Sequence, residues 1–179
     1  MKIAVFCSCS ENVGPMLLDE AEQLGAWLAE NDHEVVYGGS NTGCMGRLAS
    51  GVLSRRGRLV GVVPEMDFMQ GLVQDGLTER RVVPTLSSRK QVMIELSEGF
   101  IVYPGGLGTL DEALEVMAMK ACGSLDKPVV FYNFLDLWTP TLQAFELLVE
   151  QRLIRQPLST LVRVVDKLEA LEENLIHAL

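Results

Sequence analysis

The sequence is short of positive charge and of long apolar runs, and both shortages exclude classes of function. It has 15 lysines and arginines against 24 aspartates and glutamates, a formal net charge of −9, and no basic block. A nucleic-acid polymer is therefore not expected as a partner, although a few local donors can still bind a small anion. The N-terminal run MKIAVFCSCS is too short for a signal peptide or a membrane span, which predicts a cytoplasmic protein with no membrane partner.

Residues that commonly bind metals are also scarce. The two histidines, His33 and His177, have no plausible nucleophile beside them, and we expect both on the surface. No histidine lies near any of the four cysteines in the sequence, and only two of the four are close together, so a zinc site is not indicated. We expect reduced thiols packed as small apolar groups, with neither a metal nor a disulfide. The cysteines are Cys7, Cys9, Cys44 and Cys122.

The chain has enough apolar residues for the core of one domain, since 48% of its 179 residues are hydrophobic. Short apolar runs alternate with helical patterns along its length. The expected strands are residues 2–7, 35–39, 58–64, 80–84, 99–104, 127–133 and 161–166. The expected helices are residues 15–31, 46–57, 87–98, 109–122 and 136–150, followed by a C-terminal one. This alternation predicts a single α/β domain over residues 1–179, with a doubly wound, mainly parallel sheet and helices on both faces.

Glycine-rich loops follow two of the expected strands, where parallel sheets bind their ligands. In YPGGLGTLDEALE, residues 103–115, three glycines precede an acidic helix. One interpretation is a capping box, in which Thr109 and Glu112 each satisfy a free backbone N–H at the helix start. The other is an anion site, built from the free N–H groups and the helix dipole, with Glu112 pointing into a pocket.

The second loop, YGGSNTGCMG at residues 37–46, repeats the glycine pattern. Neither loop ends in the Gly-Lys-Ser/Thr of a Walker motif, and neither is a clean G-x-G-x-x-G, so a classical dinucleotide oxidoreductase is disfavoured. Tight turns of an ordinary α/β fold remain an alternative explanation for each loop taken alone. A long irregular stretch at residues 65–79 is a further candidate for a functional loop.

Charged residues flank the glycine loop on two helices. Arg89 and Lys90 lie near a helix start, where the dipole disfavours positive charge, so an anion such as phosphate would compensate them. Asp111 and Glu115 lie in the first turns of the next helix, where acids are stabilising and can simply face water. The periodicity of that helix predicts a buried stripe of Leu110, Leu114, Met117 and Ala121.

Four motifs together resemble the Lonely Guy (LOG) family, cytokinin riboside 5′-monophosphate phosphoribohydrolases that are often misnamed lysine decarboxylases. PGGLGTLDE (104–112) is similar to the family's P-G-G-x-G-T-x-x-E, and RKQVM (89–93) to its R-K-x-x-M. YGGSNTGCMG is similar to Y-G-G-G-x-x-G-L-M-G, and VFCSCS (5–10) to V-F-C-G-S-S. Their order and spacing agree over most of the chain.

The resemblance implies a Rossmann-like homodimer that hydrolyses the N-glycosidic bond of a nucleoside 5′-monophosphate, such as AMP or a cytokinin riboside 5′-monophosphate, without a cofactor or a metal. It implies that Arg89 and Glu112 are the catalytic pair and that residues 106–109 hold the phosphate. The candidate substrate- and phosphate-binding residues are Ser10, Gly39, Gly43, Gly46, Lys90, Gly105, Gly106, Leu107, Gly108, Thr109 and Asp111.

The chain departs from the family pattern mainly around the expected base. Ser8-Cys9-Ser10 replaces Gly-Ser-Ser, and Ser40 and Cys44 replace a Gly and a Leu. The reaction is therefore predicted more firmly than the substrate, and a broader purine or pyrimidine monophosphate nucleosidase stays open. A non-catalytic nucleotide- or cofactor-binding protein of the same fold, like the molybdenum-cofactor carriers, is the alternative from another class. A lysine decarboxylase is disfavoured, since no lysine has a convincing setting for a pyridoxal-phosphate Schiff base.

Overall fold

All seven expected strands form, and every neighbouring pair runs parallel. The computed structural model describes residues 1–176, and its strands make one sheet in the order β4-β3-β2-β1-β5-β6-β7. The strands are β1 (Lys2–Phe6), β2 (Glu34–Tyr37), β3 (Leu59–Pro64), β4 (Glu79–Val83), β5 (Gly99–Val102), β6 (Val129–Tyr132) and β7 (Arg163–Val165). The predicted doubly wound α/β fold is confirmed.

The helices connect these strands in the expected alternation. They are α1 (Pro15–Glu30), α2 (Gly43–Ser54), α3 (Leu86–Leu96), α4 (Leu107–Ala121), α5 (Thr139–Glu150), α6 (Leu158–Leu161) and α7 (Leu171–Ile176). Short 3-10 segments are η1 (Asp67–Met69), η2 (Phe134–Asp136) and η3 (Leu168–Ala170). Two helices begin two or more residues earlier than predicted, α2 at Gly43 and α4 at Leu107, and the short α6 was not expected. None of the helices in the described range is long and apolar enough to cross a membrane.

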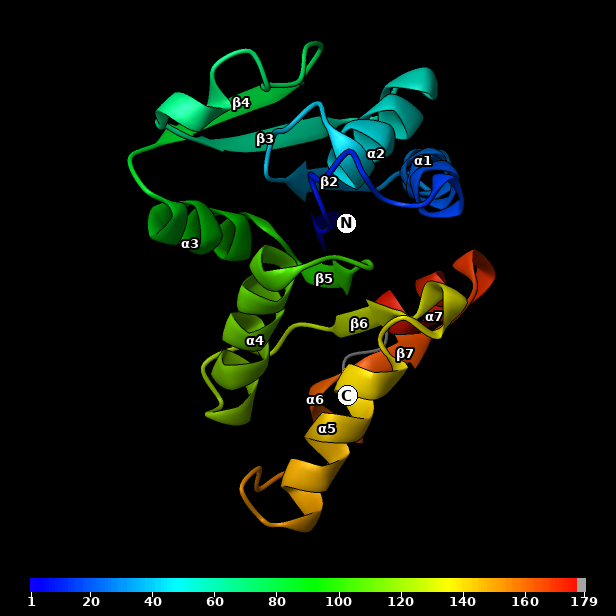
Figure 1. Cartoon of the computed structure of the whole chain (residues 1–179), viewed down its shortest axis with the longest axis vertical. Helices are drawn as coiled ribbons and strands as arrows, with labels where there is room; N and C mark the ends of the chain where they lie inside the picture. Colours follow the sequence, from blue (N-terminus) through cyan, green and yellow to red (C-terminus); the bar gives the residue numbers. More distant parts are fainter. Residues whose placement is uncertain (177–179) are drawn as a thin grey trace.

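The two faces of the sheet carry separate apolar layers because successive strand residues point to opposite sides. On β1, Ile3 and Val5 pack in the layer that contains α1, α2 and α7. Ala4 and Phe6 pack in the other layer, with α3, α4 and α6. In Figure 1, α1 and α2 lie to the right of the strands, and α3 and α4 lie to the left. Both faces of β1 are therefore buried.

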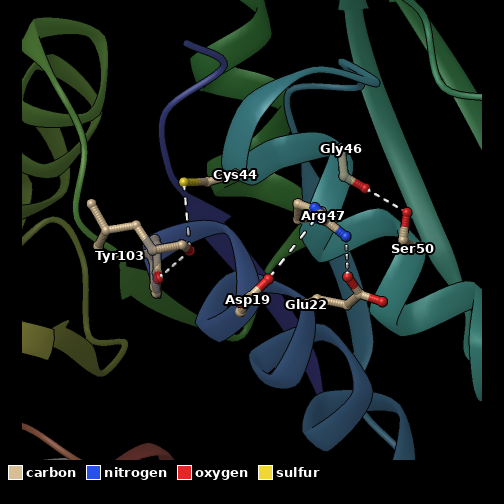
Figure 2. A network of polar contacts seen from close by, with 8 residues as sticks. Asp19, Glu22, Cys44, Gly46, Arg47, Ser50 and Tyr103 are labelled. Carbon is tan, nitrogen blue, oxygen red and sulfur yellow. Dashed lines mark hydrogen bonds and ion pairs between the residues drawn. The ribbon is translucent and has the colours of Figure 1, made fainter. Parts of the chain in front are cut away.

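Helices α1 and α2 approach each other closely because glycine replaces a side chain at two contact points. A Cβ on Gly25 would lie 2.1 Å from the Leu48 carbonyl oxygen, and one on Gly51 would lie 2.0 Å from that of Glu22. Beside this contact Arg47 donates to Glu22 at 2.7 Å, and Figure 2 shows Arg47 reaching from α2 toward α1. The contact fixes the start of α2, where the second glycine loop ends.

The strand order reverses between β1 and β5. From β1 the chain adds β2, β3 and β4 to one side, and α3 then carries it across so that β5 pairs with the other side of β1. The loops after β1 and β5 therefore diverge and leave a crevice between them. Such a topological switch point is where open α/β sheets bind ligands.

The irregular stretch at residues 65–79 is anchored to the second glycine loop. Ser40 forms an antiparallel bridge with Val73, the Asn41 N–H donates to the Leu72 carbonyl at 2.8 Å, and the Gln74 N–H donates to the Gly39 carbonyl at 2.9 Å. These contacts hold residues 72–74 against the second glycine loop.

His33 is buried rather than on the surface, with 5% of its area exposed. Its Nε2 is 2.8 Å from a Glu172 carboxylate oxygen, and its ring lies against Trp27 with centroids 5.9 Å apart, which together account for the burial. His177 lies outside the described residues.

The four cysteines are free thiols, but only half of them are packed as predicted. Cys7 and Cys44 are buried, whereas Cys9 and Cys122 are exposed, because the latter two lie in a loop and at a helix end.

Candidate active site

A cavity of about 160 Å³ lies at the switch point, with walls from five parts of the chain. The loops after β1 and β5 form two sides, and α2, α3 and α4 supply the others. Its lining residues are Cys7, Ser8, Cys9, Met45, Arg89, Gly106, Gly108, Thr109 and Glu112. The two predicted catalytic residues therefore share one cavity with part of the glycine loop.

Helix α3 places Arg89 through the cap at its start. The Thr85 hydroxyl accepts from the Ser88 N–H at 3.1 Å, and the Ser88 hydroxyl accepts from the Thr85 N–H at 3.0 Å, a complete capping box. Arg89 follows directly. Its guanidinium passes over Gly38 at the end of β2, where a Cβ would lie 3.2 Å from Nη1. Gly38 was not among the predicted site residues, although its loop was singled out.

Helix α4 places Glu112, and of the two interpretations of Thr109 and Glu112 the capping box is the one that does not form. The helix begins at Leu107 with Gly106 as its N-cap, so Thr109 already lies within the first turn. The Thr109 side chain instead packs on Gly105, where a Cβ would lie 2.1 Å from its hydroxyl oxygen. Glu112 lies one turn further on and points to α3 rather than back to the helix start.

Arg89 and Glu112 form a buried ion pair across the cavity. Arg89 Nη2 donates to Glu112 Oε1 at 2.6 Å, and the side chains are 14% and 3% exposed. Burial raises the pKa of Glu112 from 4.5 to about 7, and the neighbouring Arg89 opposes that rise only in part. Arg89 Nε is buried without a partner, so the guanidinium retains a donor for a further acceptor.

The positive charge of Lys90 is balanced by two carboxylates of the protein itself. Its Nζ lies 2.8 Å from Asp111 Oδ2 and 2.7 Å from Glu115 Oε2, which joins α3 to α4. These bonds raise the pKa of Lys90, with the bond to Asp111 the larger cause. Asp111 and Glu115 thus do more than face water, and none of the three residues lines the cavity that holds Arg89 and Glu112. Protein carboxylates supply the anionic compensation that phosphate was expected to provide.

The start of α4 offers free backbone donors to the cavity. The first hydrogen bond within the helix runs from the Leu110 N–H to the Gly106 carbonyl at 3.0 Å. The N–H groups of Leu107, Gly108 and Thr109 therefore have no partner inside the helix, and the positive end of the helix dipole adds to them. Gly106, Gly108 and Thr109 line the cavity, while the Leu107 side chain is 86% exposed. These donors and the positive end of the helix dipole favour an anion over a neutral or positively charged ligand.

The other predicted binding residues do not line this cavity. A Cβ on Gly39, where φ is +79°, would lie 2.5 Å from the Val63 side chain, and one on Gly46 would lie 2.2 Å from the Asn41 carbonyl oxygen. Gly43 has φ +57° and packs against the Ser10 carbonyl oxygen, 2.4 Å from where a Cβ would lie. Close packing, together with a positive φ at Gly39 and Gly43, thus explains these three glycines. Ser10 is exposed, and its N–H donates to the Ser8 hydroxyl at 3.1 Å.

Four lining residues were absent from the predicted site, namely Cys7, Ser8, Cys9 and Met45. Three of them belong to the CSCS segment after β1, whose position at the end of a strand was the available signal. Burial raises the pKa of Cys7 well above its usual range, so its thiol stays protonated and provides an uncharged wall beside Glu112.

The helical stripe predicted for α4 is displaced. The buried residues are Thr109, Glu112, Ala113, Val116 and Met117. Of the predicted set, Leu114 is 46% exposed, and Leu110 and Ala121 are only partly buried. The displacement turns Glu112 inward, which a stripe centred on the leucines would not do.

Comparison with known proteins gives consistent matches over most of the chain. A family model described as "Possible lysine decarboxylase" matches residues 45–175. The chain is 37% identical over 145 residues to the cytokinin riboside 5′-monophosphate phosphoribohydrolase of Rhodococcoides fascians, covering 80% of this chain and 73% of that protein. It is 33% identical over 154 residues to a probable enzyme of the same name from Oryza sativa subsp. japonica, covering 86% of this chain and 63% of the relative.

The fold is also that of a solved cofactor-binding protein. The molybdenum cofactor binding protein of Rippkaea orientalis superposes with a TM-score of 0.73 at 24% identity, covering 96% of this chain and 93% of that one. At this identity the likeness establishes the shared fold.

Proposed function

Because the chain belongs to the Lonely Guy family of phosphoribohydrolases, we propose that it hydrolyses the N-glycosidic bond of a nucleoside 5′-monophosphate to the free base and ribose 5-phosphate. The observation that carries the proposal is the ion pair of Arg89 and Glu112, whose Nη2 and Oε1 atoms are 2.6 Å apart. It lies in a cavity that the start of α4 also lines. AMP and N6-substituted AMP, of the cytokinin riboside monophosphate type, are the proposed substrates.

The start of α4 is the proposed phosphate site. A 5′-phosphate there accepts hydrogen bonds from the N–H groups of residues 107–109 and faces the positive end of the helix dipole. The ribose then lies toward Glu112, one turn along the same helix. Gly105 belongs to this site indirectly, since its lack of a side chain leaves room for Thr109.

Glu112 and Arg89 act on opposite charges as the bond breaks. The C1′–N bond cleaves with its electron pair leaving on the base, and ribose gains oxocarbenium character, which the Glu112 carboxylate stabilises. The same carboxylate orients a water whose oxygen bonds to C1′. One proton of that water passes to the departing base, and the other stays on the new 1-hydroxyl of ribose 5-phosphate. Arg89 stabilises the negative charge on the departing base or on the phosphate, with its buried and unpaired Nε as the available donor.

Release of free base from the purified protein tests this function directly. AMP, other nucleoside monophosphates and N6-isopentenyl-AMP would be incubated separately, and the base quantified by chromatography. We expect release from AMP or its N6-isopentenyl derivative, and losses of roughly 10²-fold or more in kcat for Glu112→Gln and Arg89→Ala. Glu146→Gln and Arg155→Ala remove the same groups from exposed positions outside the cavity and control for the loss of charge.

The same experiment tests the alternative of a non-catalytic carrier. Binding of nucleotides without release of base from any of them would support a carrier and contradict the proposal. Near-full activity of both catalytic-site variants would contradict the proposed roles of Arg89 and Glu112.

A decarboxylase is disfavoured by the lysines near the site. An enzyme of that kind that uses pyridoxal phosphate needs a lysine for its Schiff base. Among the described residues no lysine lines the cavity, and Lys90 is held by two carboxylates.

The remaining features of the proposal come from the family resemblance and the composition. We propose a cytoplasmic homodimer that binds a nucleoside monophosphate and no nucleic-acid polymer. The net charge of −9 opposes association with a polyanion, while the free N–H groups of α4 act over short distances on a small one.

A further inference from the structure

Three of the four cysteines lie around the loop that follows β1. Cys7 and Cys9 both line the cavity of the proposed active site. Cys44 follows Gly43, where a Cβ would lie 2.6 Å from the Cys9 carbonyl carbon, so the start of α2 packs on the same loop. The proposed hydrolysis makes use of none of these thiols.

The three thiols differ in their access to solvent. Cys7 and Cys44 are 3% and 1% exposed, whereas Cys9 is an exposed residue. Cys44 Sγ is also directed away from the cavity, toward the Leu17 carbonyl oxygen on α1 at 3.9 Å, as Figure 2 shows. A dissolved oxidant therefore reaches Cys9 and neither of the buried thiols.

Cys7 and Cys9 are close enough for a disulfide because only one residue separates them. Cα atoms two residues apart lie at most about 7 Å from each other, and disulfides join Cα atoms about 4.4–6.8 Å apart. Both residues line one cavity of about 160 Å³. Burial is the main cause of the raised pKa of Cys7, and Cys9 and Glu112 are among the neighbours whose charge adds to it. The two thiols thus lie near each other and near the proposed catalytic carboxylate.

The second thiol is a feature of this chain rather than of the family pattern. The first motif of the family, V-F-C-G-S-S, has a cysteine that corresponds to Cys7, but it has serine where this chain has Cys9. The exchange replaces a hydroxyl by a thiol of similar size. It adds redox chemistry to the wall of the cavity with little change in volume.

We propose that Cys9 is a site of reversible oxidation and that its disulfide with Cys7 shuts off the active site. Only the effect on activity rests on the proposed function. Cys9 Sγ bonds to one oxygen of hydrogen peroxide, the O–O bond breaks and water leaves, which gives a sulfenic acid. Cys7 Sγ then bonds to Cys9 Sγ, the S–O bond breaks, and the hydroxide leaves as water with the Cys7 proton. A dithiol reduces the product to the two free thiols.

The disulfide acts on the cavity by moving the loop that carries both cysteines. In the reduced protein the Cys9 carbonyl accepts from the Thr42 hydroxyl at 2.9 Å, and the Ser8 carbonyl accepts from the Met45 N–H at 3.1 Å. Drawing Cys9 toward Cys7 turns the loop against these bonds and shifts the wall beside the proposed catalytic carboxylate. A displacement of about 1 Å near the reacting groups can cost about 10²-fold in rate.

The first measurement identifies the disulfide without any substrate. The reduced protein would be treated with hydrogen peroxide, alkylated and cleaved after glutamate, which releases residues 1–11 with Cys7 and Cys9 as their only cysteines. We expect this peptide to escape alkylation, to be about 2 Da lighter than its reduced form through loss of two hydrogens, and to revert with dithiothreitol. A peptide alkylated at both thiols, or one joined to residues 35–65, which contain Cys44, would overturn the proposal.

The second measurement is the release of base from AMP before and after peroxide, with each variant compared with its own untreated activity. We expect kcat/KM of the unmodified protein to fall at least about tenfold and to recover with dithiothreitol. Cys9→Ser should resist peroxide, and Cys7→Ala should stop at a sulfenic acid that dimedone traps. Cys122→Ser removes the exposed thiol outside the cavity and should respond to peroxide as the unmodified protein does.

The two measurements separate failure of this inference from failure of the proposed function. Base release that survives peroxide, or that is lost equally in Cys9→Ser, would overturn the inference and leave the proposed function standing. No base release from the untreated protein, with the disulfide still found in residues 1–11, would contradict the proposed function and support the oxidation site.

Discussion

At the scale of single residues, Glu112 is a carboxylate on which two effects act in opposite directions. Burial disfavours its charged form, and Arg89 at 2.6 Å favours it, with burial the larger effect. The net result is a pKa of about 7, which places the change of charge near neutral pH. A group that must be ionised to stabilise a cation will then lose activity on the acid side of neutrality.

The pH profile of kcat/KM tests this consequence. The folded pKa lies above the usual 4.5, so Glu112 is protonated below about pH 7, and we expect activity to fall about tenfold per unit below that point. The substrate phosphate also titrates near pH 6, so the Glu112 carboxyl would be followed separately by ¹³C NMR in the free protein. Arg89→Gln should move that titration to higher pH, because it removes the charge that opposes the rise. A midpoint near 4.5 would contradict the assignment.

Lys90 is the second residue whose partners predict a measurable effect. Because its Nζ bonds to Asp111 and Glu115, we expect it to position Arg89 by holding α3 against α4. Lys90→Met should lower kcat roughly tenfold with little change in KM, since loosened geometry affects the transition state more than binding. Stability should change by less than about 1 kcal/mol, because both acids are substantially exposed.

Reversal of the charges separates this role from a direct contact with phosphate. Lys90→Glu combined with Glu115→Lys restores an attractive pair between the helices, and we expect it to recover most of the kcat that Lys90→Glu alone loses. A lysine that touched the phosphate would instead raise KM when replaced, and the exchange would not recover binding.

At the scale of elements, the start of α4 forms the proposed phosphate site and also sets the position of Glu112. Gly105→Ala would place a Cβ 2.1 Å from the hydroxyl oxygen of Thr109, a residue that is 2% exposed and has little room to move. We expect the loop to shift, KM for the nucleotide to rise at least tenfold, and inhibition by inorganic phosphate to weaken. Gly108→Ala meets no atom within 4 Å and should keep the melting temperature, which makes it the folding control. Equal phosphate inhibition in Gly105→Ala and the unmodified protein would contradict this account.

The order of the elements could be predicted from the sequence, and their precise contacts could not. Alternation of apolar runs with helical patterns was enough for the sheet and for the helices on both faces. The start of α4 was misplaced because a glycine can serve as the N-cap, as Gly106 does, and a downstream Thr-x-x-Glu then imitates a cap. Thr85 and Ser88 form the capping box on the other helix, although serine at its last position is not the usual residue.

The predicted catalytic pair and the glycines of the loops rested on different signals in the sequence. Motif resemblance predicted Arg89 and Glu112, but periodicity pointed away from a buried Glu112, since the apolar residues of α4 predicted another face. Periodicity failed here because Leu114 lies on the surface although it is apolar. A helix with two apolar faces does not reveal from its sequence which of them packs on the sheet. Glycine content likewise could not separate the proposed phosphate loop from Gly39, Gly43 and Gly46, which are glycines because of close packing and, at Gly39 and Gly43, a positive φ.

At the scale of the whole molecule, α4 and α5 leave apolar surface uncovered. None of the residues of α5 is buried, and Leu147 and Leu148 are 54% and 37% exposed. On α4, Leu114 is 46% exposed. In the view of Figure 1, α4 runs down to the left of β5 and β6, and α5 lies below them. Apolar side chains grouped on helices in this way commonly mark a contact with another protein, and the family resemblance makes a second copy the expected one.

The oligomeric state is therefore the prediction that belongs to this scale. We expect a dimer in sedimentation equilibrium at micromolar concentrations, and we expect Leu147→Glu or Leu114→Glu to shift it toward monomer by placing a charge in a desolvated contact. Met16→Glu is the matched control, because Met16 is 58% exposed on α1 and lies on the opposite layer of the fold. High salt should leave the dimer intact, since an apolar contact is not screened. A monomer at all concentrations, or a dimer equally sensitive to Met16→Glu, would show that these leucines do not form the interface.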